Sequence, residues 1–172
     1  MAKVVFITGG ARSGKSRLAE SLAEGFGTPL CYIATGEARD EEMAVRIAAH
    51  RTRRGNGWQT VEEPIRLMEA LKAAEGRFQA VLVDCVTLWL TNLLLSHEDA
   101  DQALAEVQAL AALLPELTIP IVLVSNEVGM GIVPDNSLAR SFRDLAGTAN
   151  QTLAAAADEV YVTFSGIPLK LK

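Results

Sequence analysis

The octapeptide GGARSGKS at residues 9–16 constrains the fold of this chain more than any other stretch. It fits the phosphate-binding pattern G-x-x-x-x-G-K-[ST] at every fixed position. An apolar run at 4–7 precedes it and a helical pattern at 16–23 follows it. Glycines allow the backbone to wrap a polyphosphate and to direct successive N–H groups at it, and the following helix adds its positive N-terminal dipole. The octapeptide therefore predicts a strand, a loop and a helix that bind a nucleoside triphosphate.

Individual residues of this loop have expected roles. Lys15 is expected to reach the β- and γ-phosphates, and the Ser16 hydroxyl to ligate Mg²⁺. A glycine-rich turn that arose by chance is the competing interpretation, and the flanking strand and helix patterns argue against it. The remaining predicted phosphate contacts are Gly9, Gly10, Ala11, Arg12, Ser13 and Gly14.

Length and charge narrow the class of protein. The 172 residues predict a single domain over 1–172, and the composition, 49% hydrophobic and 22% charged, is typical of soluble globular proteins. The net charge of −5 argues against a general nucleic-acid or anionic-membrane binder, although a local basic pocket is compatible with it. The densest apolar run, at 88–95, is far shorter than the roughly 20 residues that span a bilayer. No leader pattern precedes the first strand, so we expect a cytoplasmic protein without membrane insertion.

The chain has two cysteines, Cys31 and Cys85, and they do not form a CxxC pair. Both lie in apolar, strand-like runs, which predicts buried, reduced thiols rather than a disulfide or a metal site.

Short apolar strands alternate with longer helical segments along the chain. Such alternation, with continuously apolar strands, predicts an α/β fold with a mostly parallel sheet and helices on both faces. In the tail, Gly166 and Pro168 suggest a turn, and alternating Leu and Lys suggest a half-exposed antiparallel edge strand. The expected strands are 3–8, 30–34, 80–84, 119–125 and 159–164. The expected helices are 15–25, 39–54, 64–75, 86–95, 100–114 and 137–156.

Asp84 ends the apolar strand 80–84 downstream of the phosphate loop. A carboxylate at this place holds Mg²⁺, directly or through water, in many nucleotide-binding proteins. The alternative is a strand-end carboxylate that caps the next helix, and the upstream loop favours the metal role.

His50 closes a helical stripe with Met43, Ile47 and Arg54 at steps of three and four residues. By spacing alone it is more simply a histidine at a helix C-terminus, where positive charge is favourable. The alternative is a nucleophile or acid–base group, since a neutral imidazole is a good nucleophile near pH 7. The neighbouring Arg51, Arg53 and Arg54 fit either a phosphate site or a solvated helix end.

Two further segments are open to more than one interpretation. Glu62 would bind the N1–H and amino group of guanine, or it would begin a helix together with Pro64, and the residues alone favour the helix start. The stretch SNEVGMGIVP at 125–134 places polar groups and glycines after a strand, at the sheet edge where α/β proteins bind ligands. The N-K-x-D guanine motif of signalling GTPases does not occur in the sequence.

Taken together, these segments resemble the bifunctional adenosylcobinamide kinase / adenosylcobinamide-phosphate guanylyltransferase family of cobalamin biosynthesis. The phosphate loop is common to many families, whereas the histidine–arginine segment and NEVGMGIVP are much more specific. The resemblance runs nearly end to end and is carried, in order, by TGGARSGKS (8–16), YIATGEARDEEMAVRIAAHRTRRGNGW (32–58), TVEEP (60–64), VDCVTLWLTNLL (83–94), NEVGMGIVP (126–134), LARSFRDLAGTANQTLAAAADEV (138–160) and SGIP (165–168).

The resemblance implies two reactions on a RecA-like P-loop fold assembled as a homotrimer. First, adenosylcobinamide takes the γ-phosphoryl group of ATP or GTP. Then GTP guanylylates the family's histidine, which falls on His50, and adenosylcobinamide phosphate accepts the GMP to give adenosylcobinamide-GDP. No tightly bound organic cofactor is implied beyond Mg²⁺ and the nucleotide substrates. Besides residues 9–16, the implied GTP site uses Ala34, Thr35, Gly36, Arg51, Thr52, Arg53, Arg54, Glu62 and Asp84.

Two alternative functions remain compatible with the residues alone. One is a P-loop kinase of a small metabolite, in which His50 is structural. The other is a P-loop GTP-binding switch or assembly ATPase that acts with a protein partner.

Overall fold

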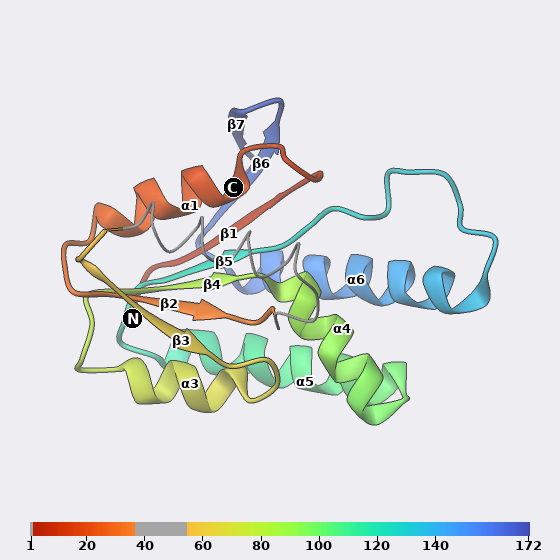
Figure 1. The fold of residues 1–172 in the computed structure, drawn as a ribbon, viewed down its shortest axis with the longest axis horizontal. Coiled ribbons are helices and arrows are strands. Elements are labelled where there is room, and N and C mark those ends of the chain that lie inside the picture. Colours follow the sequence, from red (N-terminus) through yellow and green to blue (C-terminus); the bar gives the residue numbers. More distant parts are fainter. Residues whose placement is uncertain (1, 37–54) are drawn as a thin grey trace.

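The fold, seen in a computed structural model that describes residues 2–36 and 55–172, is a seven-stranded sheet covered by helices (Figure 1). The strands follow the order β3-β2-β4-β5-β1-β6-β7. All neighbouring pairs are parallel except β6 and β7, which pair antiparallel at one edge. The strands are β1 (Val4–Gly9), β2 (Leu30–Ala34), β3 (Trp58–Glu62), β4 (Ala80–Asp84), β5 (Ile121–Val124), β6 (Glu159–Phe164) and β7 (Ile167–Lys170).

The predicted α/β architecture is confirmed, including the antiparallel C-terminal hairpin. Strand β5 separates β1, which leads into the phosphate loop, from β4, which ends at Asp84. The described helices are α1 (Lys15–Glu24), α3 (Leu67–Ala74), α4 (Val86–His97), α5 (Ala100–Leu113), the short 3₁₀ helix η1 (Leu114–Glu116) and α6 (Ser137–Ala156).

The two faces of the sheet carry separate hydrophobic cores. Successive residues of a strand point to opposite faces, so Val4 and Phe6 join one cluster while Val5 and Ile7 join the other. The larger cluster packs α3, α4, α5 and α6 against the sheet, and the smaller one packs Ala19 and Ala23 of α1. Figure 1 shows α1 on one side of the sheet and α3 to α6 on the other. Burial on both faces explains why the central strands are apolar throughout.

Strand β3 is absent from the sequence prediction, which assigned no strand between 34 and 80. Its residues, WQTVE, are half-buried or exposed: Val61 packs against the larger core and Trp58 against the smaller one, while Gln59 and Glu62 are exposed. This edge strand therefore lacks the continuous apolar run that identified the other strands. It pairs with β2 throughout, from Leu30 with Trp58 to Ala34 with Glu62.

Smaller differences concern element ends and exposure. Helix α3 begins at Leu67 rather than residue 64, since Glu63 accepts bonds from the backbone N–H groups of Ile65 and Arg66 in the turn that precedes it. Helix α4 extends to His97, two residues beyond the predicted end at 95. Strand β7 is exposed at every residue rather than half-exposed.

The expected helix 39–54 lies outside the described residues. Cys31 and Cys85 are buried and free, as predicted. Burial raises the pKa of Cys31 to about 11 and that of Cys85 to about 12, so both thiols stay protonated near neutral pH. Within residues 2–36 and 55–172, no helix combines the length and apolar character required to cross a membrane.

Candidate active site

The phosphate loop joins the end of β1 to the start of α1. Gly9 and Gly14 have φ angles of 150° and 103°, and the intervening Arg12 has φ 55°, so the backbone turns through conformations that favour glycine. The Ser13 N–H bonds the Gly10 carbonyl at 3.3 Å, and the Leu18 N–H bonds the Gly14 carbonyl as the helix begins. The N-cap residue of α1 is Gly14, which has no side chain to cap the helix. The strand, loop and helix that the octapeptide predicts are thus present, with a backbone geometry that suits an anion at the helix N-terminus.

Lys15 lies folded over this loop. Its Nζ donates a hydrogen bond to the Gly10 carbonyl at 2.6 Å, and the residue is 7% exposed. Burial lowers the pKa of Lys15, while the negative charge of Asp84 opposes that shift. A cation held against the loop backbone is suitably placed to bind the phosphate oxygens that the loop would cradle.

Ser16 and Asp84 lie in direct contact, although 68 positions separate them in the sequence. The Ser16 hydroxyl donates to Asp84 Oδ2 at 2.9 Å. The capping alternative for Asp84 does not hold, because the N-cap of α4 is Cys85 and no side chain caps that helix. A hydroxyl and a carboxylate oxygen are ligands that Mg²⁺ prefers, so the pair fits a metal bound together with the nucleotide.

A cleft of about 1050 Å³ opens over these residues. That volume lies at the upper end of the range of about 300–1,000 Å³ for ligand sites. It is lined by loop residues 11–16, the start of α1, the Asp84–Cys85 segment and Asn126. The β6–β7 hairpin also lines it, through Thr163, Ser165, Gly166 and Pro168.

A buried polar network supports Asn126 at the end of β5. The Asn126 N–H donates to Thr87 Oγ1 at 2.7 Å, and its carbonyl accepts from Asn150 Nδ2 at 3.2 Å. Ser125 Oγ donates to Asn150 Oδ1 at 2.6 Å and lies 3.3 Å from Thr87 Oγ1. The sequence prediction included Ser125 and Asn126 as polar groups at the sheet edge but missed Thr87 and Asn150. Both residues lie on the buried faces of helices, α4 and α6. A buried polar side chain needs hydrogen-bond partners, so their place on these faces could have identified them.

The segment Ala34–Gly36 lies at the same sheet edge. Register places Ala34 between Glu62 and Asp84 on the two neighbouring strands. Thr35 is fully buried, its hydroxyl donates to the Cys85 carbonyl at 2.7 Å, and it accepts from the Cys85 N–H at 2.9 Å. In the described structure Thr35 therefore holds the Asp84–Cys85 segment in place.

Glu62 ends β3 and is exposed. The helix-start role that the sequence suggested for this region belongs to its neighbour Glu63. Five predicted site residues lie outside the described residues, so their roles remain predictions: His50, Arg51, Thr52, Arg53 and Arg54.

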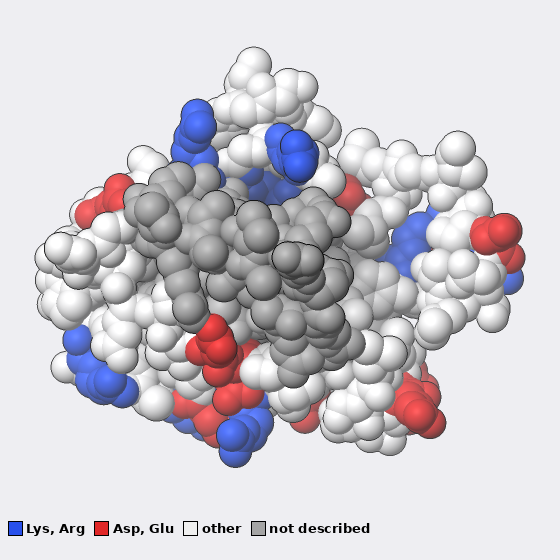
Figure 2. Space-filling model, in the orientation of Figure 1, with Lys and Arg blue, Asp and Glu red and all other residues white. Residues whose placement is uncertain are grey.

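Acidic and basic side chains are interspersed around the face shown in Figure 2.

Comparison with known proteins identifies the family. The model of the family described as "Cobinamide kinase / cobinamide phosphate guanyltransferase" matches residues 5–171. This chain belongs to that family. It is 49% identical over 166 residues to the bifunctional adenosylcobalamin biosynthesis protein CobP of Pseudomonas aeruginosa, covering 96% of this chain and 95% of the relative.

Two further relatives are similar over almost their whole lengths. The bifunctional adenosylcobalamin biosynthesis protein CobU of Escherichia coli K12 is 48% identical over 181 aligned residues, and that of Salmonella typhimurium is 45% identical over 181. In each comparison 98% of this chain and 99% of the relative are covered. The family predicted from the sequence is confirmed.

Proposed function

We propose that this protein carries out two consecutive steps of cobalamin biosynthesis. It phosphorylates adenosylcobinamide with ATP or GTP, and it then transfers GMP from GTP to adenosylcobinamide phosphate through a covalent GMP–His50 intermediate. The products of the second step are adenosylcobinamide-GDP and pyrophosphate.

The observation that carries the proposal is the juxtaposition of Lys15, Ser16 and Asp84 in one cleft, in a member of a family described by these two activities. Each of the three side chains meets a different requirement of triphosphate chemistry. Lys15 is a cation for phosphate oxygens, and the Ser16 hydroxyl and the Asp84 carboxylate are ligands for a metal. The cleft volume also leaves room for a nucleotide.

In the phosphorylation step, the hydroxyl oxygen of adenosylcobinamide attacks the γ-phosphorus as the bond to the β–γ bridging oxygen breaks. The hydroxyl proton is lost, and the nucleoside diphosphate leaves. Lys15 and the backbone N–H groups of the loop would stabilise the charge on the transferring group. Ser16 and Asp84 would hold Mg²⁺, which neutralises phosphate charge when bound.

In the transfer step, a ring nitrogen of His50 attacks the α-phosphorus of GTP and pyrophosphate leaves, so that a phosphoramidate stores the GMP. A phosphate oxygen of adenosylcobinamide phosphate then attacks the same phosphorus and releases His50. In this step the loop would bind the leaving pyrophosphate. Arg51, Thr52, Arg53 and Arg54 would offset charge on the α-phosphate, and Glu62 would bind guanine through its N1–H and amino group.

The decisive experiment is incubation of the purified protein with adenosylcobinamide, GTP and Mg²⁺, with products identified by mass. We expect adenosylcobinamide phosphate first and adenosylcobinamide-GDP later. Incubation with α-³²P GTP should leave a label on the protein that acid removes and base does not. Unlabelled protein would contradict the histidine intermediate and leave a simple kinase.

Variants at His50 and Lys15 separate the two steps. His50→Ala should abolish GMP transfer and labelling while phosphorylation survives. Lys15→Ala should impair both steps, because in both of them Lys15 and the loop would bind the triphosphate. His97→Ala changes the chain's other histidine and serves as the matched control. Loss of both activities in a folded His50→Ala protein would argue against separate roles.

The assembly and location follow the same proposal. A homotrimer is compatible with exposed apolar side chains such as Ile132, Met130 and Ile167, which are 96%, 75% and 70% exposed. Light scattering on the purified protein measures its mass and tests the trimer. Two free cysteines fit the reducing cytoplasm.

A further inference from the structure

The C-terminal β6–β7 hairpin packs against the phosphate loop as well as lining the cleft. Thr163 Oγ1 of β6 lies 2.6 Å from Ser13 Oγ of the loop, and the two residues are 1% and 8% exposed. The Gly166 N–H, in the hairpin turn, donates to the Ser13 carbonyl at 2.9 Å. Side chain and backbone of the same loop residue are therefore both held by the hairpin.

Two loop glycines are shaped by this contact. A Cβ on Gly9 would lie 2.6 Å from the Thr163 carbonyl oxygen and 2.7 Å from Thr163 Oγ1, closer than a Cβ carbon approaches another heavy atom. A Cβ on Gly14 would lie 3.1 Å from Gly166 Cα. The glycines of the phosphate-binding pattern thus also make room for the hairpin at these positions.

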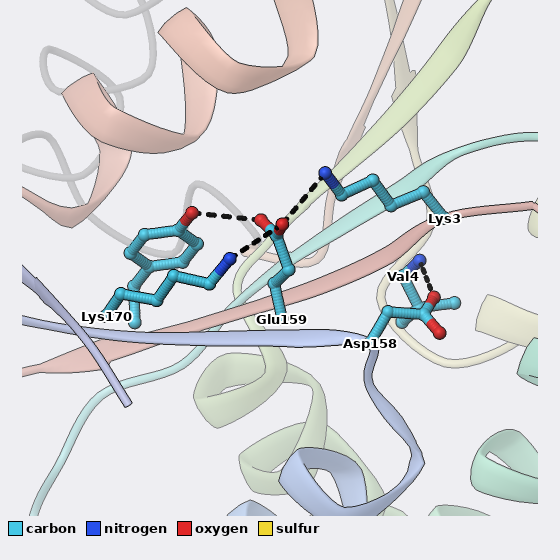
Figure 3. Close-up of polar contacts among 6 residues, drawn as sticks. Lys3, Val4, Asp158, Glu159 and Lys170 are labelled. Atoms are coloured by element: carbon cyan, nitrogen blue, oxygen red, sulfur yellow. Dashed lines mark hydrogen bonds and ion pairs between the residues drawn. The ribbon is translucent and has the colours of Figure 1, made fainter. Parts of the chain in front are cut away.

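The base of the hairpin is anchored to the start of β1. Glu159 binds Lys3 at 3.0 Å and Lys170 at 2.9 Å, and it accepts from the Tyr161 hydroxyl at 2.9 Å (Figure 3). The Val4 N–H donates to Asp158 Oδ2 at 2.7 Å. The hairpin is therefore held at both ends, at its base by strand β1 and at its turn by the loop that follows β1.

We propose that Thr163 is a positioning residue for triphosphate binding. It fixes the Ser13 hydroxyl, and together with the turn at Gly166 it keeps the backbone of the phosphate loop in the conformation that binds the nucleotide. This inference concerns the binding of a nucleoside triphosphate to the loop. It rests on the proposed function only for which reactions follow that binding.

The physical reason is the flexibility of the loop itself. Glycines lose more conformational entropy on ordering than other residues, and a loop that is already ordered loses less when the ligand binds. A buried hydroxyl pair contributes to that order only while both partners are present, because either oxygen alone is buried without a partner. Loss of the Thr163 hydroxyl should therefore weaken nucleotide binding and change the turnover number at saturating nucleotide much less.

The test compares Thr163→Val, which keeps the shape and removes the hydroxyl, with Thr163→Ser, which keeps the hydroxyl. The affinity for GTP with Mg²⁺ is measured by titration calorimetry in the absence of cobinamide. We expect Thr163→Val to bind about tenfold more weakly, which corresponds to about 1.4 kcal/mol, because the loop is less ordered before the nucleotide binds. Thr163→Ser should stay within about twofold of the wild type. Thr148→Val, at an exposed threonine of α6 outside the cleft lining, is the control and should bind normally.

Kinetics give a second readout. Phosphorylation and GMP transfer should lose kcat/KM for the nucleotide by the same factor in Thr163→Val, with kcat within about threefold. Wild-type affinity in a folded Thr163→Val protein would overturn the inference, as would an equal loss in Thr163→Ser.

A partner variant keeps the inference testable if Thr163→Val fails to fold. Ser13→Ala removes the same hydrogen bond from the loop side and should weaken GTP binding to the same extent, and unchanged affinity there would also overturn the inference. When both variants fold, their combination should cost no more than either alone. If the wild type binds GTP but leaves adenosylcobinamide unchanged, the proposed function fails, while the binding data still decide the role of Thr163.

Discussion

Two polar clusters of different character flank β1, one beside β5 and one beside β6. On the β5 side, Thr87, Ser125 and Asn150 form a neutral, buried network behind Asn126. On the β6 side, Glu159 binds lysines in a charged cluster, with Lys3 and Lys170 about half exposed. The loop contacts both neighbours: the Glu127 N–H donates to the Gly9 carbonyl at 2.9 Å, and Gly166 and Thr163 contact Ser13.

Hydrogen bonds and ion pairs of similar length in the two clusters are expected to contribute differently to the free energy of unfolding. Removal of one partner from a buried hydrogen-bonded network leaves other groups unpaired and costs about 1–3 kcal/mol per group. Ion pairs between exposed side chains contribute about 0–1 kcal/mol and are screened by salt. We therefore expect the network beside β5 to contribute most to the stability of the fold. We expect the hairpin beside β6 to contribute mainly by positioning the phosphate loop.

The largest effect is expected for Asn150→Leu. The change leaves the Ser125 hydroxyl and the Asn126 carbonyl without their partner in a buried site. The free energy of unfolding, measured with urea, should fall by about 2–4 kcal/mol. Thr148→Ala, at an exposed position of the same helix, should change it by less than about 0.5 kcal/mol. A loss as small as that of the control would mean that the network is not a source of stability.

Thr87→Val should have the next largest effect. Valine keeps the shape of threonine but removes the acceptor for the Asn126 N–H. We expect a loss of about 1–2 kcal/mol in the free energy of unfolding. Thr91→Val is the matched control on α4, because the Thr91 hydroxyl bonds only to the Thr87 carbonyl one turn earlier among the described residues. Equal losses in the two variants would contradict a special role of the network.

Glu159→Gln should cost about 0.5–1 kcal/mol at pH 7 and low salt. Hydrogen bonds from Lys170, Lys3 and Tyr161 lower the pKa of Glu159 to about 2. A lowered carboxyl pKa stabilises the folded state above the unfolded value, near 4.5, and that contribution disappears as pH falls toward 2. The difference between wild type and variant should thus vanish between pH 5 and 2, and it should shrink in 1 M salt. A difference that persists at pH 2 would point to packing rather than charge.

Lys172→Ala should have the smallest effect. Its Nζ donates to the carbonyls of Ala154, Ala155 and Ala157 at the end of α6, where positive charge interacts favourably with the helix dipole. The expected loss is about 0.3–1 kcal/mol at low salt. Thermal unfolding monitored by circular dichroism measures it, and the loss should shrink in 1 M salt because salt screens the interaction. A loss larger than that of Glu159→Gln would reverse the order expected for the β6 side.

Much of the fold follows from local patterns in the sequence. Continuous apolar runs identified the buried strands β1, β2, β4 and β5, and the octapeptide identified the loop and the helix after it. Strand β3 was missed because this edge strand is only half-buried or exposed and has no such run. Helix α3 begins three residues later than predicted, since Glu63 accepts bonds from two backbone N–H groups in the turn before it.

The sequence by itself determined the family, and it predicted roles for Lys15, Ser16 and Asp84, because the chemistry of these residues is tied to fixed spacing and strand ends. Only the tertiary structure decided which distant residues support the loop. Thr163 lies 150 positions from Ser13, and Thr87 and Asn150 meet at Asn126 from two different helices. No local pattern carries such contacts, since they depend on strand order and on how helices pack against the sheet.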